Sequence, residues 1–387
     1  MSEIKTIVFN KPYSSDFSIN YLNDVLISHK HSGNGKFTNH VNNFFQNKYN
    51  IKKTLLTSSC TDALEMVALL IDIKFGDEII LPSYTFVSTA NAFALRGAKL
   101  VFCDSESNFP NIDAAKIGSL ITKKTKAIVV VHYAGFACNM EKIVSIAKEN
   151  NLFLVEDAAQ AIDNYHINEL GAKVPLGTIG DFGTLSFHET KNISCGEGGL
   201  LMVNNSKFLN QSNIILEKGT NRTTFMEGKV NKYEWVGLGS SFLPSEFTAA
   251  ILYSQLKIKD RIISKRLQIW NRYHDNLVEL QNDNQLREIR YPFYSTNNAH
   301  MYFIVTKSFE ERENLINYLK DNKISAVSHY LSLNKSPFFL KNNPKVDLKN
   351  SDMFSNCLLR LPLFYDLRIK EVDYICSIVK NFYTKNS

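Results

Sequence analysis

The sequence lacks the features that mark three broad classes of protein. Its longest apolar runs, such as 127–131 and 152–155, are too short to cross a bilayer, so we expect no membrane insertion. Residues 1–16 show no basic start followed by an apolar stretch, so we expect no signal peptide and a cytoplasmic protein. No block of Lys and Arg is dense enough to indicate nucleic-acid binding, although the net charge of +6 favours an anionic ligand such as a nucleotide.

Motifs for metals, disulfides and nucleotide loops are equally missing. The six cysteines are scattered without a Cys-x-x-Cys pair, so neither a zinc site nor a disulfide framework is expected. His188 and Glu189 adjoin each other, but no third ligand accompanies them, so we predict no metal. Residues 33–36 lack the Walker spacing and a preceding strand, and residues 196–199 are not a dinucleotide fingerprint. The remaining composition, 44% hydrophobic and 21% charged, is that of an ordinary globular protein.

Short apolar runs alternate with helical patterns between about residues 50 and 205. We interpret the apolar runs as strands, at 78–81, 99–104, 127–132, 152–156, 182–187 and 200–203. The helix-like stretches between them lie at 61–73, 87–95, 112–121 and 139–150. Continuous apolar strands separated by helices are typical of a mostly parallel sheet covered on both faces, so the sequence predicts an α/β fold.

The alternation stops near residues 237–241, and a different pattern follows. A long helical pattern runs from 244 to about 280, and further strands and helices are indicated at 301–305, 311–321, 326–330 and 370–382. This order predicts a second, smaller α+β domain, and 387 residues are enough for two domains. We place the boundary inside the long helix, giving a large domain of residues 1–255, with an N-terminal arm, and a small domain of residues 256–387.

Lys191 and Asp157 are the candidate catalytic pair. Lys191 lies between a strand end and a glycine-rich turn, where a rigid and partly desolvated seat would let its amine lose a proton. Asp157 follows a predicted strand and would point to the edge where α/β sheets bind ligands, although alone it would be interpreted as a helix N-cap. Together they suit a pyridoxal cofactor, because a lysine holds its aldehyde as a Schiff base and a carboxylate keeps its ring nitrogen protonated.

A candidate phosphate seat precedes the helix that is predicted to begin near Thr61. Residues 57–61 are rich in Ser and Thr, and a helix N-terminus attracts anions, although ordinary capping explains the same pattern. Ser186 would supply a hydroxyl to the same phosphate or be an inward-facing strand serine, and Phe86 would stack on a flat cofactor or belong to the core. His132 ends a strand, and its role stays open between a chemical and a structural one.

These stretches together resemble the sugar-nucleotide aminotransferase family, a group of fold-type-I enzymes that depend on pyridoxal phosphate (PLP). The resemblance covers essentially the whole chain and rests on residues 59–61, 82–91, 131–135, 155–160, 186–192, 217–222, 298–301 and 361–365. Two departures are present: Cys60 stands where most members have Gly, and residues 239–243 replace a Gly-Tyr-Asn-Tyr-Arg motif. The branch that makes dTDP-4-amino-4,6-dideoxygalactose for enterobacterial common antigen looks similar at both places, and it is the branch that the chain most resembles.

The resemblance implies a role for each candidate site residue. Lys191 and Asp157 take the catalytic positions described above, and Gln160 lies near the phenolic oxygen of the cofactor. The other implied cofactor contacts are the stacking ring and the phosphate cup, at Phe86, Cys60, Thr61 and Ser186, with Ser241 in place of the Asn that reaches the phosphate in the partner subunit. His329 and Tyr330 are candidates for lining the nucleotide, with a core role equally open for both.

The implied activity is transfer of an amino group from L-glutamate to C4 of dTDP-4-keto-6-deoxy-D-glucose. The product would be dTDP-4-amino-4,6-dideoxy-D-galactose for a surface polysaccharide such as O-antigen, lipopolysaccharide or common antigen. PLP would alternate with its amine form, PMP, in a homodimer. Amination at C3, formation of the gluco epimer and a PLP-binding regulatory protein stay open as alternatives. The related 3-dehydratases carry histidine in place of the lysine, so the presence of Lys191 argues against dehydratase activity.

Overall fold

The computed structural model describes residues 6–386 of the chain, and a seven-stranded sheet forms its centre. The strands follow the order β1-β9-β8-β5-β4-β2-β3. The run from β8 to β3 is parallel, and it consists of β8 (Phe182–Ser186), β5 (Phe153–Asp157), β4 (Thr125–Val131), β2 (Glu78–Pro82) and β3 (Lys99–Cys103). The edge strand β1 (Lys53–Thr57) and its neighbour β9 (Gly199–Val203) pair antiparallel. The predicted mostly parallel sheet is confirmed.

Helices cover both faces of this sheet because its strands are apolar at successive positions. In β2, Ile79 and Leu81 pack on one side, whereas Ile80 packs on the other, as the alternation of side chains along a strand requires. The first side carries α3 (Cys60–Leu70), α4 (Val87–Ala94) and α7 (Leu209–Leu216). The opposite side carries α2 (Lys36–Tyr49), α5 (Ala114–Ile117), α6 (Met140–Glu149) and α9 (Glu246–Leu256).

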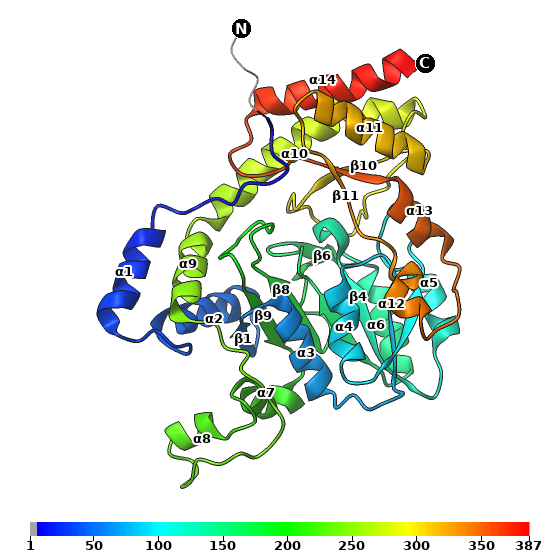
Figure 1. Ribbon diagram of the computed structural model, residues 1–387. Coiled ribbons are helices and arrows are strands. Elements are labelled where there is room, and N and C mark those ends of the chain that lie inside the picture. Colours follow the sequence, from blue (N-terminus) through cyan, green and yellow to red (C-terminus); the bar gives the residue numbers. More distant parts are fainter. Residues whose placement is uncertain (1–5, 387) are drawn as a thin grey trace.

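A second layer lies beside the carboxyl ends of the parallel strands. Its three-stranded sheet has the order β10-β12-β11 and is formed by β10 (Tyr302–Val305), β12 (Leu358–Leu361) and β11 (Val327–Ser328). The helices of this layer are α10 (Lys259–Asn282), α11 (Phe309–Asp321), α12 (Pro337–Leu340), α13 (Lys349–Cys357) and α14 (Ile369–Asn386), and Figure 1 shows most of them above the central sheet. Its core also contains Tyr84, Phe109 and Tyr133 from the first half of the chain, so the two layers are packed together. The division at residues 255 and 256 stays a prediction.

Several elements were not predicted from the sequence. They are α1 (Ser18–Ser28), α2, β1, the hairpin of β6 (Tyr165–Ile167) and β7 (Lys173–Pro175), α7, α8 (Arg222–Met226), α12, α13 and β12. In Figure 1, α8 and the loops around it project from the body of the protein below α7. Within residues 6–386, no helix is both long and apolar enough to span a membrane.

Three predicted elements differ from the structure. The helical pattern from 244 to 280 is two helices, α9 and α10, because Ile258 leaves helical geometry at φ −119° and ψ 13°. The predicted helix 112–121 is only the four-residue α5, which Asp113 caps, followed by a 3-10 turn. The predicted strand 326–330 is limited to the two residues of β11, because Tyr330 has a left-handed φ of 39° and ends the extended geometry.

Candidate active site

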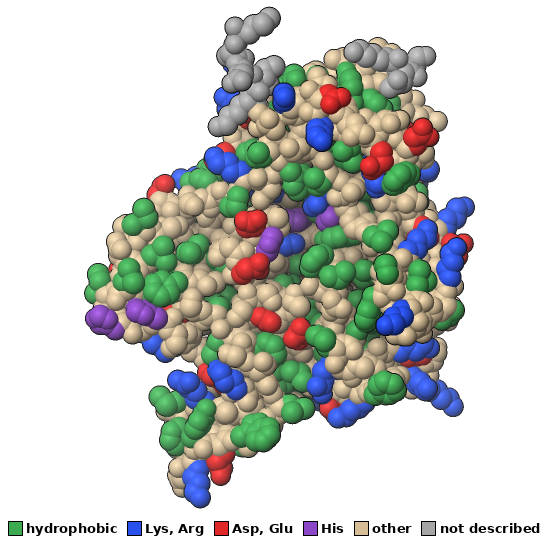
Figure 2. All heavy atoms as spheres, viewed as in Figure 1, with side chains coloured by type: hydrophobic (Ala, Val, Ile, Leu, Met, Phe, Trp, Pro, Cys, Tyr) green, Lys and Arg blue, Asp and Glu red, His purple; other side chains and the backbone are tan. Residues whose placement is uncertain are grey.

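A cavity of about 740 Å³ opens at the carboxyl ends of β2, β4, β5 and β8. Sheets of this kind bind ligands at that edge, and the volume is within the range of small-molecule sites. The small layer closes the other side of the cavity with residues from β12 and the end of β11. Figure 2 shows this hollow with histidine and basic side chains inside it and acidic side chains along one rim.

Lys191 reaches the cavity from the turn between β8 and β9. Backbone hydrogen bonds hold this turn: Lys191 N donates to His188 O at 2.9 Å, Phe187 N donates to Gly198 O at 2.8 Å, and Cys195 N donates to Phe187 O at 2.9 Å. Burial lowers the pKa of the Lys191 amine. Within the described part of the chain, that amine has no hydrogen-bond or ion-pair partner, so it is held in place by the turn and remains available to a ligand.

Asp157 ends β5 and faces the same cavity with only 5% of its surface exposed. Its Oδ2 accepts a hydrogen bond from Thr89 Oγ1 at 2.7 Å, and its Oδ1 accepts one from Ala159 N at 3.2 Å. Burial raises the pKa of Asp157, whereas these two donors and the charge of Lys191 act in the opposite direction. A carboxylate accepts up to about four hydrogen bonds, so Asp157 retains capacity for a donor from a ligand.

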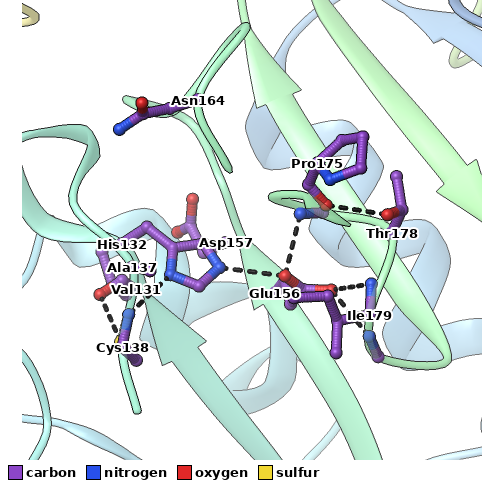
Figure 3. Close-up of polar contacts among 12 residues, drawn as sticks. Val131, His132, Ala137, Cys138, Glu156, Asp157, Asn164, Pro175, Thr178 and Ile179 are labelled. Carbon is purple, nitrogen blue, oxygen red and sulfur yellow. Dashed lines mark hydrogen bonds and ion pairs between the residues drawn. The ribbon is translucent and has the colours of Figure 1, made fainter. Parts of the chain in front are cut away.

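A second buried carboxylate, Glu156, supports the end of β5 from behind the cavity (Figure 3). Its carboxylate accepts hydrogen bonds from the backbone N–H groups of Gly177, Ile179 and Gly180 at 2.8, 2.6 and 2.6 Å, and it pairs with His132 Nε2 at 3.0 Å. His132 Nδ1 accepts from the backbone of Cys138, so the hydrogen on Nε2 is donated to Glu156. His132 is absent from the cavity wall, and the structure therefore gives it a supporting role.

Replacing Glu156 by glutamine should destabilise the protein without removing a group from the cavity. The amide would turn an N–H₂ group toward backbone donors that water does not reach, at a cost of about 1–3 kcal/mol for each donor left unpaired. We expect the thermal midpoint of Glu156→Gln to fall by several degrees in a calorimetric scan. An unchanged midpoint, beside the matched exposed variant Glu149→Gln, would contradict a structural role for this carboxylate.

The residues of the predicted phosphate seat lie together at the start of α3. Ser59 caps this helix, its Oγ accepting from Asp62 N at 3.0 Å, and the first N–H groups of a helix have no acceptor within it. Thr61 Oγ1 donates to Ser88 Oγ at 2.8 Å, and both residues line the cavity together with Cys60 and Ser186. Ser88 and Thr89 were not predicted as site residues, although both lie in the stretch 82–91 that carried the resemblance.

Gly199 explains how closely the start of α3 approaches the sheet. A Cβ at Gly199 would lie 2.3 Å from the carbonyl oxygen of Ser59, so any larger residue would push β9 away from the helix. The turn that holds Lys191 and the helix terminus at Cys60 are thereby fixed against each other.

Phe86, Gln160 and Tyr330 form another wall of the cavity. The Phe86 side chain is 55% exposed although it lines a cavity, and its ring centroid lies 6.1 Å from that of Tyr330. Gln160 accepts from Ala134 N at 2.7 Å through Oε1 and donates to the Tyr330 hydroxyl at 3.2 Å through Nε2. An exposed aromatic face in such a wall is suited to stacking on a flat ligand.

His329 and Ser241 take different positions from those of the other candidates. His329 lines the cavity but is largely buried, and its Nδ1 pairs with the Tyr133 hydroxyl at 2.7 Å, so it belongs to the core as well as to the wall. Ser241 is exposed, forms a backbone bridge with Glu217 and is absent from the cavity wall. The structure brings every other predicted site residue to one cavity and leaves Ser241 outside it.

The residues present fit a pyridoxal phosphate. One cavity contains, at Lys191, a partly buried amine without a partner among residues 6–386 and, at Asp157, a buried carboxylate with spare acceptor capacity. The same cavity has an exposed aromatic face at Phe86 and a helix terminus beside the hydroxyls of Thr61 and Ser88. Each chemical group of the cofactor, its aldehyde, ring nitrogen, ring face and phosphate, therefore has a complementary group in the wall.

Comparison with known proteins agrees with this geometry. Residues 12–380 match the DegT/DnrJ/EryC1/StrS aminotransferase family. The chain is 29% identical over 366 residues to the GDP-perosamine synthase of Escherichia coli O157:H7, covering 94% of this chain and 95% of that protein. Two solved structures have the same fold: the aminotransferase TlmJ from Streptoalloteichus hindustanus, with a TM-score of 0.89, 24% identity and coverage of 99% and 100%, and Spr1654 from Streptococcus pneumoniae in its PLP form, with a TM-score of 0.88, 22% identity and coverage of 98% and 99%.

Proposed function

The chain belongs to the DegT/DnrJ/EryC1/StrS family of PLP-dependent sugar aminotransferases, which act on nucleotide sugars, and from this premise we propose its substrates. L-glutamate is the amino donor, and C4 of dTDP-4-keto-6-deoxy-D-glucose is the acceptor. The product is dTDP-4-amino-4,6-dideoxy-D-galactose, a precursor of a surface polysaccharide. The observation that carries transamination is the partly buried Lys191 amine, which faces the cavity of Asp157 and has no partner among the described residues. Support for the sugar is the resemblance of residues 59–61 and 239–243 to the common-antigen branch.

When bound, PLP supplies an electron sink for the carbon atom that exchanges its nitrogen. Lys191 would hold its aldehyde, and the Asp157 carboxylate would accept a hydrogen bond from its protonated ring nitrogen in a pocket where burial strengthens their attraction. The start of α3 with Thr61, together with Ser186, would bind the phosphate, and Phe86 would stack on the ring. Gln160 would lie beside the phenolic oxygen, as the resemblance implies.

Lys191 also moves the proton between the substrate and the cofactor. Once the amino donor has taken its place, the lysine amine is free, and burial, which lowers its pKa, increases the neutral fraction that can accept a proton. The closed turn keeps the amine at the same position in both half-reactions, because its backbone bonds do not involve the side chain. The small layer covers the cavity and limits the access of water.

The proposal includes a homodimer. Residues 217–241 project from the body with several large apolar side chains exposed, including Trp235 at 78% and Leu238 at 62%. An apolar projection of this kind is typical of a protein interface. Ser241, outside the cavity of its own chain, would then reach the phosphate in the partner subunit. A monomer in sedimentation at micromolar concentration would contradict the homodimer.

The substrate is tested with a panel of keto-sugar nucleotides. We expect the enzyme with PLP and L-glutamate to aminate dTDP-4-keto-6-deoxy-D-glucose at C4 and to give the galacto configuration, as determined by NMR. GDP-linked and 3-keto sugars are the matched alternatives, and the name of the perosamine relative makes the GDP compound the stricter control. Preferred amination at C3, a gluco product or a preference for GDP would each overturn this assignment. A cofactor absorbance that does not respond to glutamate would favour the regulatory alternative.

A further inference from the structure

Arg360 is the one arginine in the wall of the active-site cavity, and within the described residues its guanidinium has no acceptor. Its Nε is buried without a hydrogen-bond partner, and no carboxylate forms an ion pair with it. Neighbouring buried arginines differ: Arg312 donates to Ser355 O at 2.7 Å, and Arg266 donates to His300 O at 2.7 Å. A buried donor without a partner costs about 1–3 kcal/mol, so this arrangement indicates a group that is completed by a ligand.

Arg360 is held in the cavity by packing that leaves its N–H groups free. It lies on β12, the central strand of the small sheet, where its backbone is opposite Phe303 and Val327. Its Cζ lies 4.7 Å from the centre of the Phe9 ring, a cation–π contact that uses no N–H donor. The planar guanidinium is therefore positioned without protein hydrogen bonds and can donate two parallel bonds to a carboxylate.

Arg360 places a positive charge in the cavity that Lys191 also lines. Burial lowers the pKa of Lys191, and the positive charge of Arg360 lowers it further. Burial and Arg360 also lower the pKa of His329. The acidic residues in the cavity wall are Asp157, which Thr89 and Ala159 already occupy in part, and Glu197, which pairs with His188 at 3.6 Å. Neither acidic residue pairs with Arg360, so its positive charge favours an anionic ligand in this part of the cavity.

The position of Arg360 indicates which of the anionic groups of the proposed cofactor and substrates it would bind. The cofactor phosphate belongs at the start of α3, where Ser59 and Thr61 lie. The diphosphate of a nucleotide sugar is separated from the reacting C4 carbon by the width of the sugar ring, so it cannot lie beside Lys191 while C4 does. In an amino acid, by contrast, the α-carboxylate is bonded directly to the reacting carbon. Only that carboxylate must lie near the lysine amine whenever the donor reacts.

We propose that Arg360 binds the α-carboxylate of the amino donor and thereby selects an amino acid rather than a simple amine as the nitrogen source. This assignment rests on the proposed transaminase function and adds the donor site to it. In the other half-reaction, the guanidinium donates to neutral sugar oxygens. Such hydrogen bonds are weaker than those to a carboxylate. The loss of Arg360 should therefore weaken the binding of the amino donor far more than the binding of the nucleotide sugar.

The test compares Arg360→Gln and Arg360→Lys with wild-type holoenzyme and with Arg290→Gln, which removes an exposed charge outside the cavity. Cofactor absorbance after mixing with L-glutamate gives the donor half-reaction, and calorimetry with glutarate, which has two carboxylates but no amine, gives binding without turnover. We expect Arg360→Gln to weaken both by about 10- to 100-fold, with partial recovery in Arg360→Lys. The dissociation constant of the nucleotide sugar should rise by a smaller factor than that of the donor, since Arg360 would contact a neutral oxygen of the sugar but a carboxylate of the donor.

The stability of the variant separates binding from folding. Because Arg360 makes no hydrogen bond or ion pair within the described residues, we expect the thermal midpoint of Arg360→Gln to be unchanged or raised. Unchanged glutamate and glutarate affinity, or an equal loss for the nucleotide sugar, would overturn the donor-site assignment while leaving transamination intact. A wild-type enzyme whose absorbance responds to neither glutamate nor any keto-sugar nucleotide would instead contradict the proposed function, and the assignment would fall with it.

Discussion

Replacing Lys191 by alanine is expected to lower transamination by at least about 10⁴-fold, or about 5 kcal/mol in the activation barrier. The substitution removes both the covalent attachment of the cofactor and the group that moves the proton. Lys191 is the lysine in the cavity wall formed by the described residues, and the arginine there, Arg360, carries a guanidinium in place of an amine that could hold an aldehyde. No neighbouring side chain can therefore take over its two roles.

This prediction is checked by single-turnover kinetics with glutamate and by the absorption spectrum of the purified protein. The variant should lose the visible band of lysine-bound PLP while keeping its thermal midpoint, because the Lys191 side chain makes no protein hydrogen bond within residues 6–386. Lys173→Ala, at an exposed position on β7, is the matched control and should retain both colour and rate. Near-wild-type turnover in Lys191→Ala would contradict the assignment of Lys191 as a catalytic residue.

Replacing Asp157 by asparagine is expected to lower the turnover number by about 10²- to 10⁴-fold, corresponding to the 3–5 kcal/mol cost of breaking a buried ion pair. Asparagine keeps the size of the side chain and can still accept from Thr89, so the change is mainly one of charge. Without the carboxylate, the ring nitrogen of the cofactor loses its proton more readily, and the ring becomes a weaker electron sink. Glutamate should still bind, because its proposed site at Arg360 is untouched.

Thr89→Val is the graded control for Asp157. It removes one hydrogen bond from the carboxylate but keeps its charge, so the rate at neutral pH should fall much less than in Asp157→Asn. Burial raises the pKa of Asp157 and the Thr89 hydroxyl opposes that rise, so its removal should raise the pKa further. The acidic limb of the pH–rate profile should consequently move to higher pH. A limb that stays in place, or an active Asp157→Asn, would contradict the role of this carboxylate.

The central sheet could be predicted because its strands are encoded locally. β2, β4, β5 and β8 are buried on both faces, and continuous apolar runs were enough to identify them and to place Asp157 and Ser186 at one edge. α2 was missed although its buried residues Phe37, Val41, Phe45 and Tyr49 follow helical spacing. β12 is four residues long, and so short an apolar run does not distinguish a strand from a helix without its neighbours.

The order of the chemical groups along the chain is determined by the sequence: a Ser/Thr-rich helix start, an acid after a strand, and a lysine in a glycine-rich turn. Each of these features depends on residues that are adjacent in the chain. Capping preferences and apolar periodicity, which are local properties of the sequence, therefore indicate them. Only the tertiary structure decided that Arg360 and Lys191 line one cavity and that Tyr330 contacts Gln160 and Phe86. The position of Ser241 outside the cavity of its own chain was likewise visible only there. These contacts arise when the small layer packs over the carboxyl edge of the sheet. That Arg360 has no hydrogen-bond partner among the described residues becomes visible only when the side chains around it are placed.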